Sequence, residues 1–313
     1  MFRLIMGRIA LAIPVLFIVT ALSFVLVSFI PGNAATSILG QNATPETIQA
    51  LNAQLGLDKP LGEQYLNWIG AALHGDLGQS IFTGDPITET VLGRIAPTLY
   101  VAGFATLVAA IIGIALGTIA AVRGGGIARA LDVLGMVGIS LPNFWFALIL
   151  VVFVSGQLGL LPSLGYTDPS EDTGLWLSQL VLPVTALSIA GVAMIAKQTR
   201  DALVEALSRD FMRFMQANGI SRRSLIYRHG LRYSATAIVS GITSTFINLF
   251  GGTVALETIF AIPGLGLLVN QSTLQHDLPV VQGTVLAYTA VILVVTLLAD
   301  IGYRLLDRKV ASR

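Results

Sequence analysis

The sequence predicts an all-α integral membrane protein with six transmembrane helices and both termini in the cytoplasm. Hydrophobic residues make up 54% of the 313 residues and charged residues only 11%, against about 25% charged in ordinary soluble chains. Six stretches are apolar over roughly the 20 residues that a helix needs to cross the hydrocarbon of a bilayer. Lysine and arginine fall almost entirely on one side of these stretches, and this asymmetry orients membrane proteins.

We expect the spans at about residues 9–30, 97–122, 133–155, 180–196, 234–256 and 280–299. The first resembles a secretory signal because Arg3 and Arg8 precede it. Its apolar core of about 22 residues exceeds the 7–15 of a signal peptide, so we interpret it as a retained span. The fourth is the shortest and contains Pro183.

With both termini inside, the cytoplasmic segments hold 16 of the 18 lysines and arginines, and only Lys59 and Arg94 lie outside. The net charge of +1 is therefore less informative than its distribution. The chain has no cysteine, which excludes disulfides and thiolate metal sites, and its three histidines are scattered. We expect no metal or cofactor in this chain and no nucleic-acid partner.

The predicted spans divide the chain into a first helix (1–30), an extracytoplasmic cap (31–96), a five-helix core (97–306) and a cytoplasmic tail (307–313). Proline opens three short amphipathic patterns in the cap, which predict helices over 45–56, 60–75 and 86–95. Such helices either rest on lipid headgroups or pack against a partner, and the sequence leaves both open.

The cytoplasmic loop 197–233 carries eight lysines and arginines against three acids. Apolar residues recur there at helical spacing and predict one stripe that ends where glycine permits a sharp turn. The members of this stripe are Leu203, Leu207, Phe211, Phe214 and Met215, and the glycine is Gly219. A cationic, amphipathic loop of this kind indicates a docking surface for a cytoplasmic partner.

Small and polar residues recur every fourth position along the fifth span: Thr236, Ser240, Ser244, Asn248 and Gly252. Such a stripe lines a water-filled path or packs against another helix, and both alternatives stay open. Glu257 follows at the end of this span, where it could contact substrate, although we favour a surface acid. Pro263-Gly-Leu-Gly266 predicts a turn in the outer loop.

Several kinds of chemistry are absent from the sequence. It has no phosphate-binding Gly-x-x-x-x-Gly-Lys-Ser/Thr motif, no Gly-x-Ser-x-Gly turn and no His-Glu-x-x-His pair. No acid lies in mid-membrane, where a proton or sodium site would be expected. We therefore predict no catalytic residue, and the energy for any transport must come from a partner.

Ordered fragments along nearly the whole chain carry a resemblance. They are Leu55-Gly-Leu-Asp-Lys-Pro-Leu61, Gly75-Asp-Leu-Gly78, Arg94-Ile-Ala-Pro-Thr98, Ser140-Leu-Pro142, Asp210-Phe-Met-Arg213, Arg228-His-Gly-Leu-Arg232, Glu257-Thr-Ile-Phe260, Pro263-Gly-Leu-Gly266 and Pro279-Val-Val-Gln-Gly283. The chain resembles the permease subunits of binding-protein-dependent ABC importers, in the dipeptide/oligopeptide branch that also includes nickel and glutathione systems.

This resemblance implies the type I ABC importer permease architecture in a prokaryotic inner membrane. It implies a second permease subunit, two cytoplasmic ATPase subunits that bind ATP and Mg²⁺, and an extracytoplasmic substrate-binding protein. Peptides are the implied cargo, with nickel or glutathione as alternatives. The implied ATPase-coupling residues are Phe211, Arg213, Phe214, Met215, Ala217, Gly219, Ile220, Ser221, His229 and Leu231. The predicted translocation path comprises Ser240, Ser244, Asn248 and Glu257.

The chain also departs from the family pattern. Arg213-Phe-Met-Gln-Ala-Asn-Gly219 replaces the family's run of small residues, and no proline follows Arg232. Two other function classes stay open at this point. An ion-coupled secondary transporter would need a coupling-ion site, and a non-transporting membrane scaffold would explain the docking loop without the ordered motifs.

Overall fold

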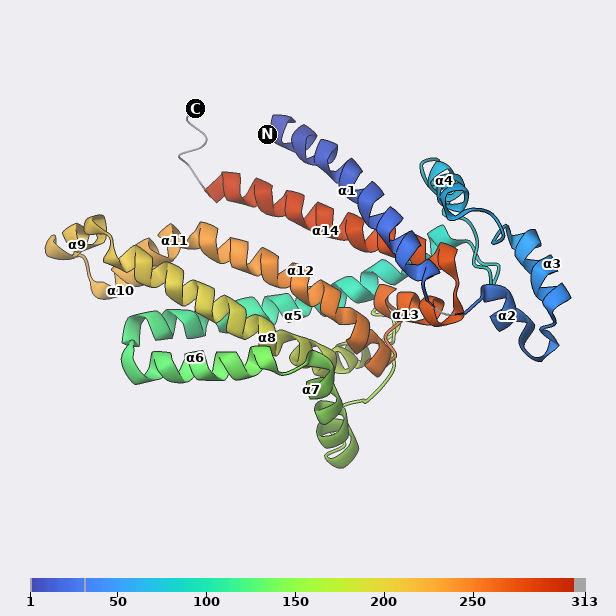
Figure 1. The fold of residues 1–313 in the computed structure, drawn as a ribbon. Helices are drawn as coiled ribbons and strands as arrows, with labels where there is room; N and C mark the ends of the chain where they lie inside the picture. Colours follow the sequence, from blue (N-terminus) through green and yellow to red (C-terminus); the bar gives the residue numbers. More distant parts are fainter. Residues whose placement is uncertain (1, 31, 307–313) are drawn as a thin grey trace. The chain divides into compact units, whose positions relative to one another are not determined.

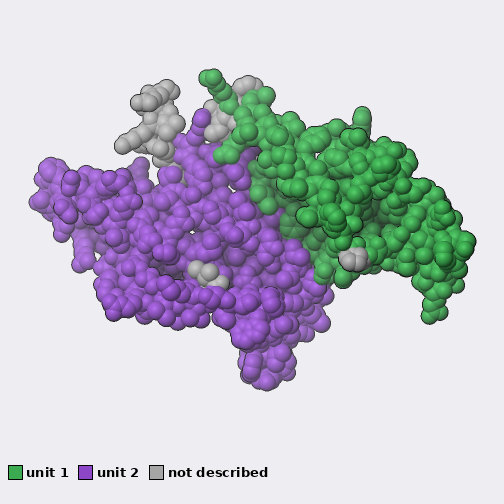
Figure 2. Space-filling model, viewed as in Figure 1, with its two compact units in different colours: residues 1–98, 263–294 green, residues 99–262, 295–313 purple. Residues whose placement is uncertain are grey.

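The computed structural model describes residues 2–30 and 32–306, so the predicted tail 307–313 lies outside the described residues. The described residues form helices joined by turns, with one isolated bridge between Gln79 and Pro86 (Figure 1). The chain forms two compact units, one of residues 1–98 and 263–294, the other of residues 99–262 and 295–313 (Figure 2).

The first unit holds the N-terminal span, the cap and the start of the last span. Its helices are α1 (Phe2–Ser28), α2 (Ala34–Leu39), the 3-10 turn η1 (Gly40–Asn42), α3 (Pro45–Leu55), α4 (Leu61–Ala72), the start of α5 (Ile87–Arg123), α13 (Leu265–Gln275) and the first part of α14 (Leu278–Leu306).

Local sequence explains the cap helices. Thr44 and Thr47 form a capping box, with Thr47 N–H donating to Thr44 Oγ1 at 3.3 Å and Thr44 N–H to Thr47 Oγ1 at 2.9 Å. Gly56 ends α3 with φ of +70°. The two helices predicted over 45–56 and 60–75 are confirmed. The third, over 86–95, is wrong as a separate helix, because Pro97 lies inside a continuous α5.

Polar contacts hold the cap onto its own unit. The Tyr65 hydroxyl on α4 lies 3.0 Å from Thr20 Oγ1 and donates to the Phe17 carbonyl at 3.2 Å, both on α1. Ser80 donates to the carboxylate of the buried Asp277 at 2.5 Å. These bonds fix α4 against α1, and the 76–86 loop against the turn between α13 and α14.

The second unit holds the rest of the spans. Its helices are the remainder of α5, α6 (Gly125–Ser140), α7 (Asn143–Leu150) with the π-helical turn η2 (Val151–Gln157), α8 (Thr173–Ser208), α9 (Asp210–Ala217), α10 (Arg222–Ser224), the π-helical turn η3 (Leu225–Gly230), α11 (Leu231–Tyr233), α12 (Ala235–Phe260) and the end of α14.

Five described helices are long and apolar enough to cross a membrane, and six if the bent pair α6–α7 counts as one span. The third predicted span, 133–155, is therefore not one straight helix. It bends by 90° where Leu141 adopts an extended conformation, because a residue before proline is disfavoured in the α region. The outer loop contains α13, which the sequence pattern did not predict.

Helix α8 is the centre of the second unit. Trp176 near its start packs edge-on against Tyr100 and Phe104 of α5, at ring-centroid distances of 5.1 and 5.9 Å. Near its other end, Gln198 donates to the Ala237 carbonyl at 3.1 Å and Ser234 Oγ to the Ala202 carbonyl at 3.0 Å. These two hydrogen bonds join α8 to Ser234, which precedes α12, and to Ala237 in the first turn of α12.

The backbones of α5 and α8 approach closely at Gly117. A Cβ atom there would lie 2.4 Å from the Ala196 carbonyl oxygen and 2.7 Å from Thr199 Cβ. Helices in lipid associate through such small residues because no hydrophobic force drives them together. By contrast, a Cβ at Gly103 of the same helix meets nothing within 4 Å.

We therefore expect Gly117→Ala to destabilise the protein by about 1–3 kcal/mol, the usual cost of overpacking. Both Gly117→Ala and the control Gly103→Ala gain the same helix propensity, so their difference isolates the α5–α8 contact. The thermal midpoint of the detergent-purified protein measures the effect. Equal midpoints for the two variants would contradict the close packing.

Candidate functional site

The predicted docking loop, residues 197–233, begins inside α8, which continues to Ser208. Arg209 leaves the helical conformation, with φ of −69° and ψ of 144°, and α9 starts at the next residue. The single apolar stripe predicted from Leu203 to Met215 is therefore wrong. Leu203 is fully buried on α8, whereas Phe211 and Phe214 belong to the separate helix α9. Apolar residues keep a helical spacing both before and after Arg209, so the sequence pattern did not reveal the break between α8 and α9.

Helix α9 presents aromatic side chains to its surroundings. Phe214 is 71% exposed and Phe211 is 42% exposed, and Phe211 lies against Tyr233 with ring centroids 5.3 Å apart. Met212, which was absent from the predicted set, is the buried side chain of α9. One face of α9 thus anchors the helix while another leaves large apolar surface uncovered.

A left-handed glycine ends this segment. Asn218 Nδ2 donates to the Phe214 carbonyl at 2.8 Å, Ile220 N–H donates to the Met215 carbonyl at 3.2 Å, and Gly219 has φ of +82°. The left-handed conformation costs a residue other than glycine about 1–2 kcal/mol of conformational energy. The turn predicted at Gly219 is confirmed.

The chain then returns toward α12 through short helical turns. Ser221 caps α10 by accepting from Ser224 N–H at 3.3 Å, and Leu225 and Ile226 are buried. None of the ten predicted coupling residues is fully buried. Met215, Ile220, His229 and Leu231 are half-buried, and the remaining six are exposed: Phe211, Arg213, Phe214, Ala217, Gly219 and Ser221. Figure 1 shows α9 and α10 at one end of α8 and α12.

Charge at this end is mostly basic. Arg209 donates to the Glu205 carboxylate, and this hydrogen bond raises the pKa of the Arg209 guanidinium, which keeps it charged. Arg200 Nη1 donates to both carboxylate oxygens of Asp132 of α6, at 2.5 Å each. This pair ties α6 to α8 beside the docking loop.

Three of the four predicted path residues, Ser240, Ser244 and Asn248, lie on one face of α12 together with Thr236. Thr236, Ser244 and Asn248 are exposed and Ser240 is half-exposed. The opposite face, with Gly241, Thr245, Leu249 and Thr253, is buried. Thr245 and Leu249 of the buried face approach Gly191 of α8, and Gly252 at the end of the stripe lies close to Leu187 of α8. The exposed part of the small polar face is therefore the part with Thr236, Ser244 and Asn248.

Glu257 differs from this face. Its side chain is fully buried, so the interpretation as a surface acid is wrong. The helix continues to Phe260, and position 257 falls on the same side as the buried Thr253 and Phe260. A role in the translocation path stays a prediction.

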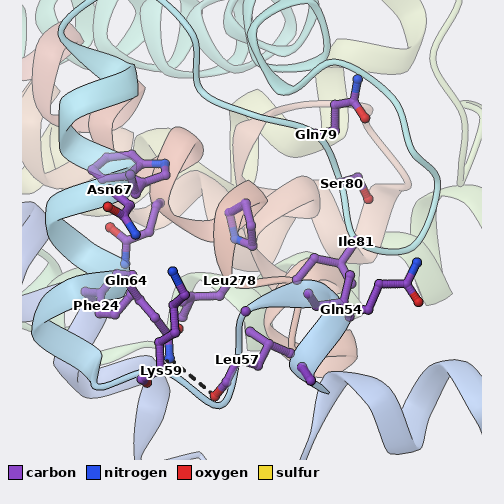
Figure 3. A pocket seen from close by; sticks show the side chains of 16 residues that line it. Phe24, Gln54, Leu57, Lys59, Gln64, Asn67, Gln79, Ser80, Ile81 and Leu278 are labelled. Carbon is purple, nitrogen blue, oxygen red and sulfur yellow. Dashed lines mark hydrogen bonds between the residues drawn. The ribbon is translucent and has the colours of Figure 1, made fainter. Parts of the chain in front are cut away.

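A cavity of about 670 Å³ lies in the first unit, between the cap and the ends of α1 and α14 (Figure 3). Amide side chains line it, among them Gln54, Gln64 and Asn67. Gln64 Nε2 donates to the carbonyls of Lys59 at 2.7 Å and Leu57 at 3.3 Å, and Lys59 pairs with Glu63. These groups hold the turn between α3 and α4, and the sequence pattern gave no signal for this cavity.

Comparison with known proteins decides the class. The profile of the binding-protein-dependent transport system inner membrane component matches residues 113–312, and that of the N-terminal part of the same components matches residues 1–102. The chain belongs to this family. It is a permease subunit of an ABC importer, as the sequence motifs indicated.

Curated relatives match the permease over nearly its whole length. It is 36% identical over 312 residues, 99% of each chain, to a putative peptide transport system permease protein of Brucella abortus (strain 2308). It is 33% identical over 307 residues, 98% of each chain, to a probable peptide ABC transporter permease of Sinorhizobium fredii. It is 33% identical over the full length of both chains to the dipeptide transport system permease protein of Escherichia coli (strain K12).

Solved structures confirm the predicted architecture. The permease resembles a chain in the inward-facing MetNI methionine ABC transporter with a TM-score of 0.57 and 17% sequence identity. The match covers 72% of this permease and 99% of that chain. At this identity the likeness shows the fold alone.

We expect Gly219→Val to loosen the end of α9, because valine at φ of +82° costs about 1–2 kcal/mol. Amide hydrogen exchange over residues 215–221 should then accelerate by about five- to thirtyfold. Ala217→Val places the same side chain on the exposed surface of α9 and should change exchange little. Equal exchange in the two variants would show that the turn does not depend on the glycine.

Proposed function

We propose that this permease moves peptides that an extracytoplasmic binding protein delivers, driven by ATP hydrolysis in two cytoplasmic ATPase subunits. The support for peptides is the naming of relatives at 33–36% identity as peptide and dipeptide permeases. The permease itself performs no catalysis, and a second permease subunit completes the membrane part of the importer. ATP and Mg²⁺ bind to the ATPase subunits.

The uncovered aromatic face of α9 is the observation that supports the coupling role. An exposed Phe214 beside a half-exposed Phe211 offers the anchors that helix-in-groove recognition uses. Arg213 and the neighbouring cations favour an acidic rim around such a groove. Helix α9 follows α8 after a single extended residue, so a displacement of α9 by an ATPase subunit is passed directly to α8.

The exposed face of α12 supports the second part of the proposal. Ser244 and Asn248 are exposed in a helix that is long and apolar enough to span the membrane. Asn248 Nδ2 donates to the Ser244 carbonyl at 2.8 Å, and the amide keeps a second N–H and its oxygen for other partners. Exposing such groups to hydrocarbon is costly, so this face meets water or the second permease subunit. We assign it to the translocation path.

The cargo is tested with the assembled importer reconstituted into vesicles. A labelled dipeptide should accumulate only with ATP, and unlabelled dipeptide should compete while glutathione and nickel ions should not. Uptake that continues without ATP but stops with an ionophore would support an ion-coupled transporter instead. Competition by glutathione or nickel would reassign the cargo within the same family.

The path is tested by single cysteines, for which the cysteine-free sequence is a clean background. Cysteine at Asn248 in the assembled importer should react with a water-soluble thiol reagent, and bound peptide should slow the reaction. Cysteine at Thr253, which is buried on the opposite face of the same helix, is the control and should stay unreactive. Equal reactivity at both positions, or no effect of peptide, would refute the assignment.

A further inference from the structure

The docking loop itself forms part of a basic cavity, and none of the residues that line this cavity is assigned a role above. The cavity has a volume of about 380 Å³ and lies between the end of α5 and the segment from α10 into η3. Thr118, Ile119, Val122, Arg123, Arg222, Arg223, Ile226 and Tyr227 line it. The volume falls within the range of about 300–1,000 Å³ that is typical of small-ligand sites.

Three guanidinium groups surround this cavity without a compensating acid. Neither an aspartate nor a glutamate is among its lining residues, and within the described part of the chain no ion pair involves Arg123, Arg222 or Arg223. Arg222 Nη2 donates to the Val122 carbonyl at 3.3 Å near the C-terminus of α5. That helix end contributes only about half a negative charge, which leaves most of the positive charge unneutralised.

The floor of the cavity is apolar and belongs to a membrane span. Ile119 is 41% exposed and lies about one helical turn before Arg123, which ends α5. Ile226 and Val122 add further apolar surface, and Tyr227, 60% exposed, carries a hydroxyl group at the rim. Arginines beside the exposed aliphatic side chain of Ile119, with a tyrosine among the lining residues, match the boundary between phosphate headgroups and acyl chains.

We propose that this cavity binds the headgroup of an anionic phospholipid from the inner leaflet. The three arginines contact the phosphate oxygens, and the acyl chains run along Ile119 of α5. A soluble phosphate would use the arginines but not the exposed aliphatic floor. An acidic ATPase surface would have no use for a floor that continues into the membrane span.

The site has a consequence for the importer, which rests on the proposed role of α9. Arg222 is the first residue of α10 and follows the Gly219 turn closely. A headgroup that bridges Arg123 and Arg223 therefore clamps the far side of the docking loop to the end of α5. Bound lipid would thus hold α9 in position for the ATPase subunit.

The test measures phosphatidylglycerol bound to the assembled importer by native mass spectrometry, with phosphatidylcholine as the neutral reference. The double variant Arg123→Gln/Arg223→Gln should weaken phosphatidylglycerol binding by about 25-fold, or about fivefold per arginine, the equivalent of about 1 kcal/mol each. The control Arg129→Gln/Arg232→Gln removes the same charge from exposed positions outside the cavity and should change binding less than about twofold. Arg222 is left intact because it also bonds the α5 backbone.

Three results would overturn the proposal. Equal weakening in both double variants would show diffuse electrostatic attraction, and displacement of phosphatidylglycerol by millimolar inorganic phosphate would show a soluble-anion site. Unchanged lipid binding together with loss of ATPase subunits would show a protein contact. If the double variant does not assemble, Arg223→Gln alone should still give the fivefold effect. Lipid binding is measured without peptide, so a wrong cargo assignment leaves this result intact.

Discussion

The close approach of α5 and α8 at Gly117 is the contact on which the second unit depends. Inside a bilayer, apolar side chains gain nothing by leaving lipid for each other, so helices associate where their backbones meet and polar groups bond across them. Gly117 allows the close approach of the two backbones. The hydrogen bonds of Gln198, Ser234 and Arg200 are the polar bonds between α8 and its neighbours. All three bonds lie near the end of α8 that leads into α9. A displacement of α9 would therefore reach a helix that is hydrogen-bonded to both α6 and α12, as the proposed coupling role requires.

The end of the permease that carries α9 and α10 combines two surfaces of different chemistry. Helix α9 exposes aromatic side chains suited to a protein groove, whereas the cavity beside α10 gathers arginines over an aliphatic floor. The Gly219 turn separates them. We propose that α9 contacts the ATPase subunit and that the arginine cavity binds lipid of the inner leaflet. The docking loop would then lie between an ATPase subunit that moves and a bilayer that does not.

Much of the fold was predictable from the sequence, because long apolar segments are the strongest signal for membrane-spanning helices. Apolar length predicted the span helices, and Thr44, Pro45 and Gly56 predicted the bounds of α3. The breaks between helices were harder to predict. Apolar residues keep a helical spacing on both sides of Arg209, and the 90° bend after Ser140 depends on the extended conformation of Leu141 alone. Burial was also missed at Glu257, because the sequence does not reveal where a helix continues past the apolar run. The arginine cavity unites residues about 100 positions apart, a relation that no local pattern contains.

The coupling role of α9 is tested most directly by a photo-reactive amino acid placed at Phe214 in the assembled importer. Phe214 is exposed and makes no contribution to the buried core of this chain, so the substitution leaves the fold intact. Illumination should cross-link the permease to an ATPase subunit, and the yield should change when ATP is bound. Capture of lipid alone, or of the extracytoplasmic binding protein, would contradict the account.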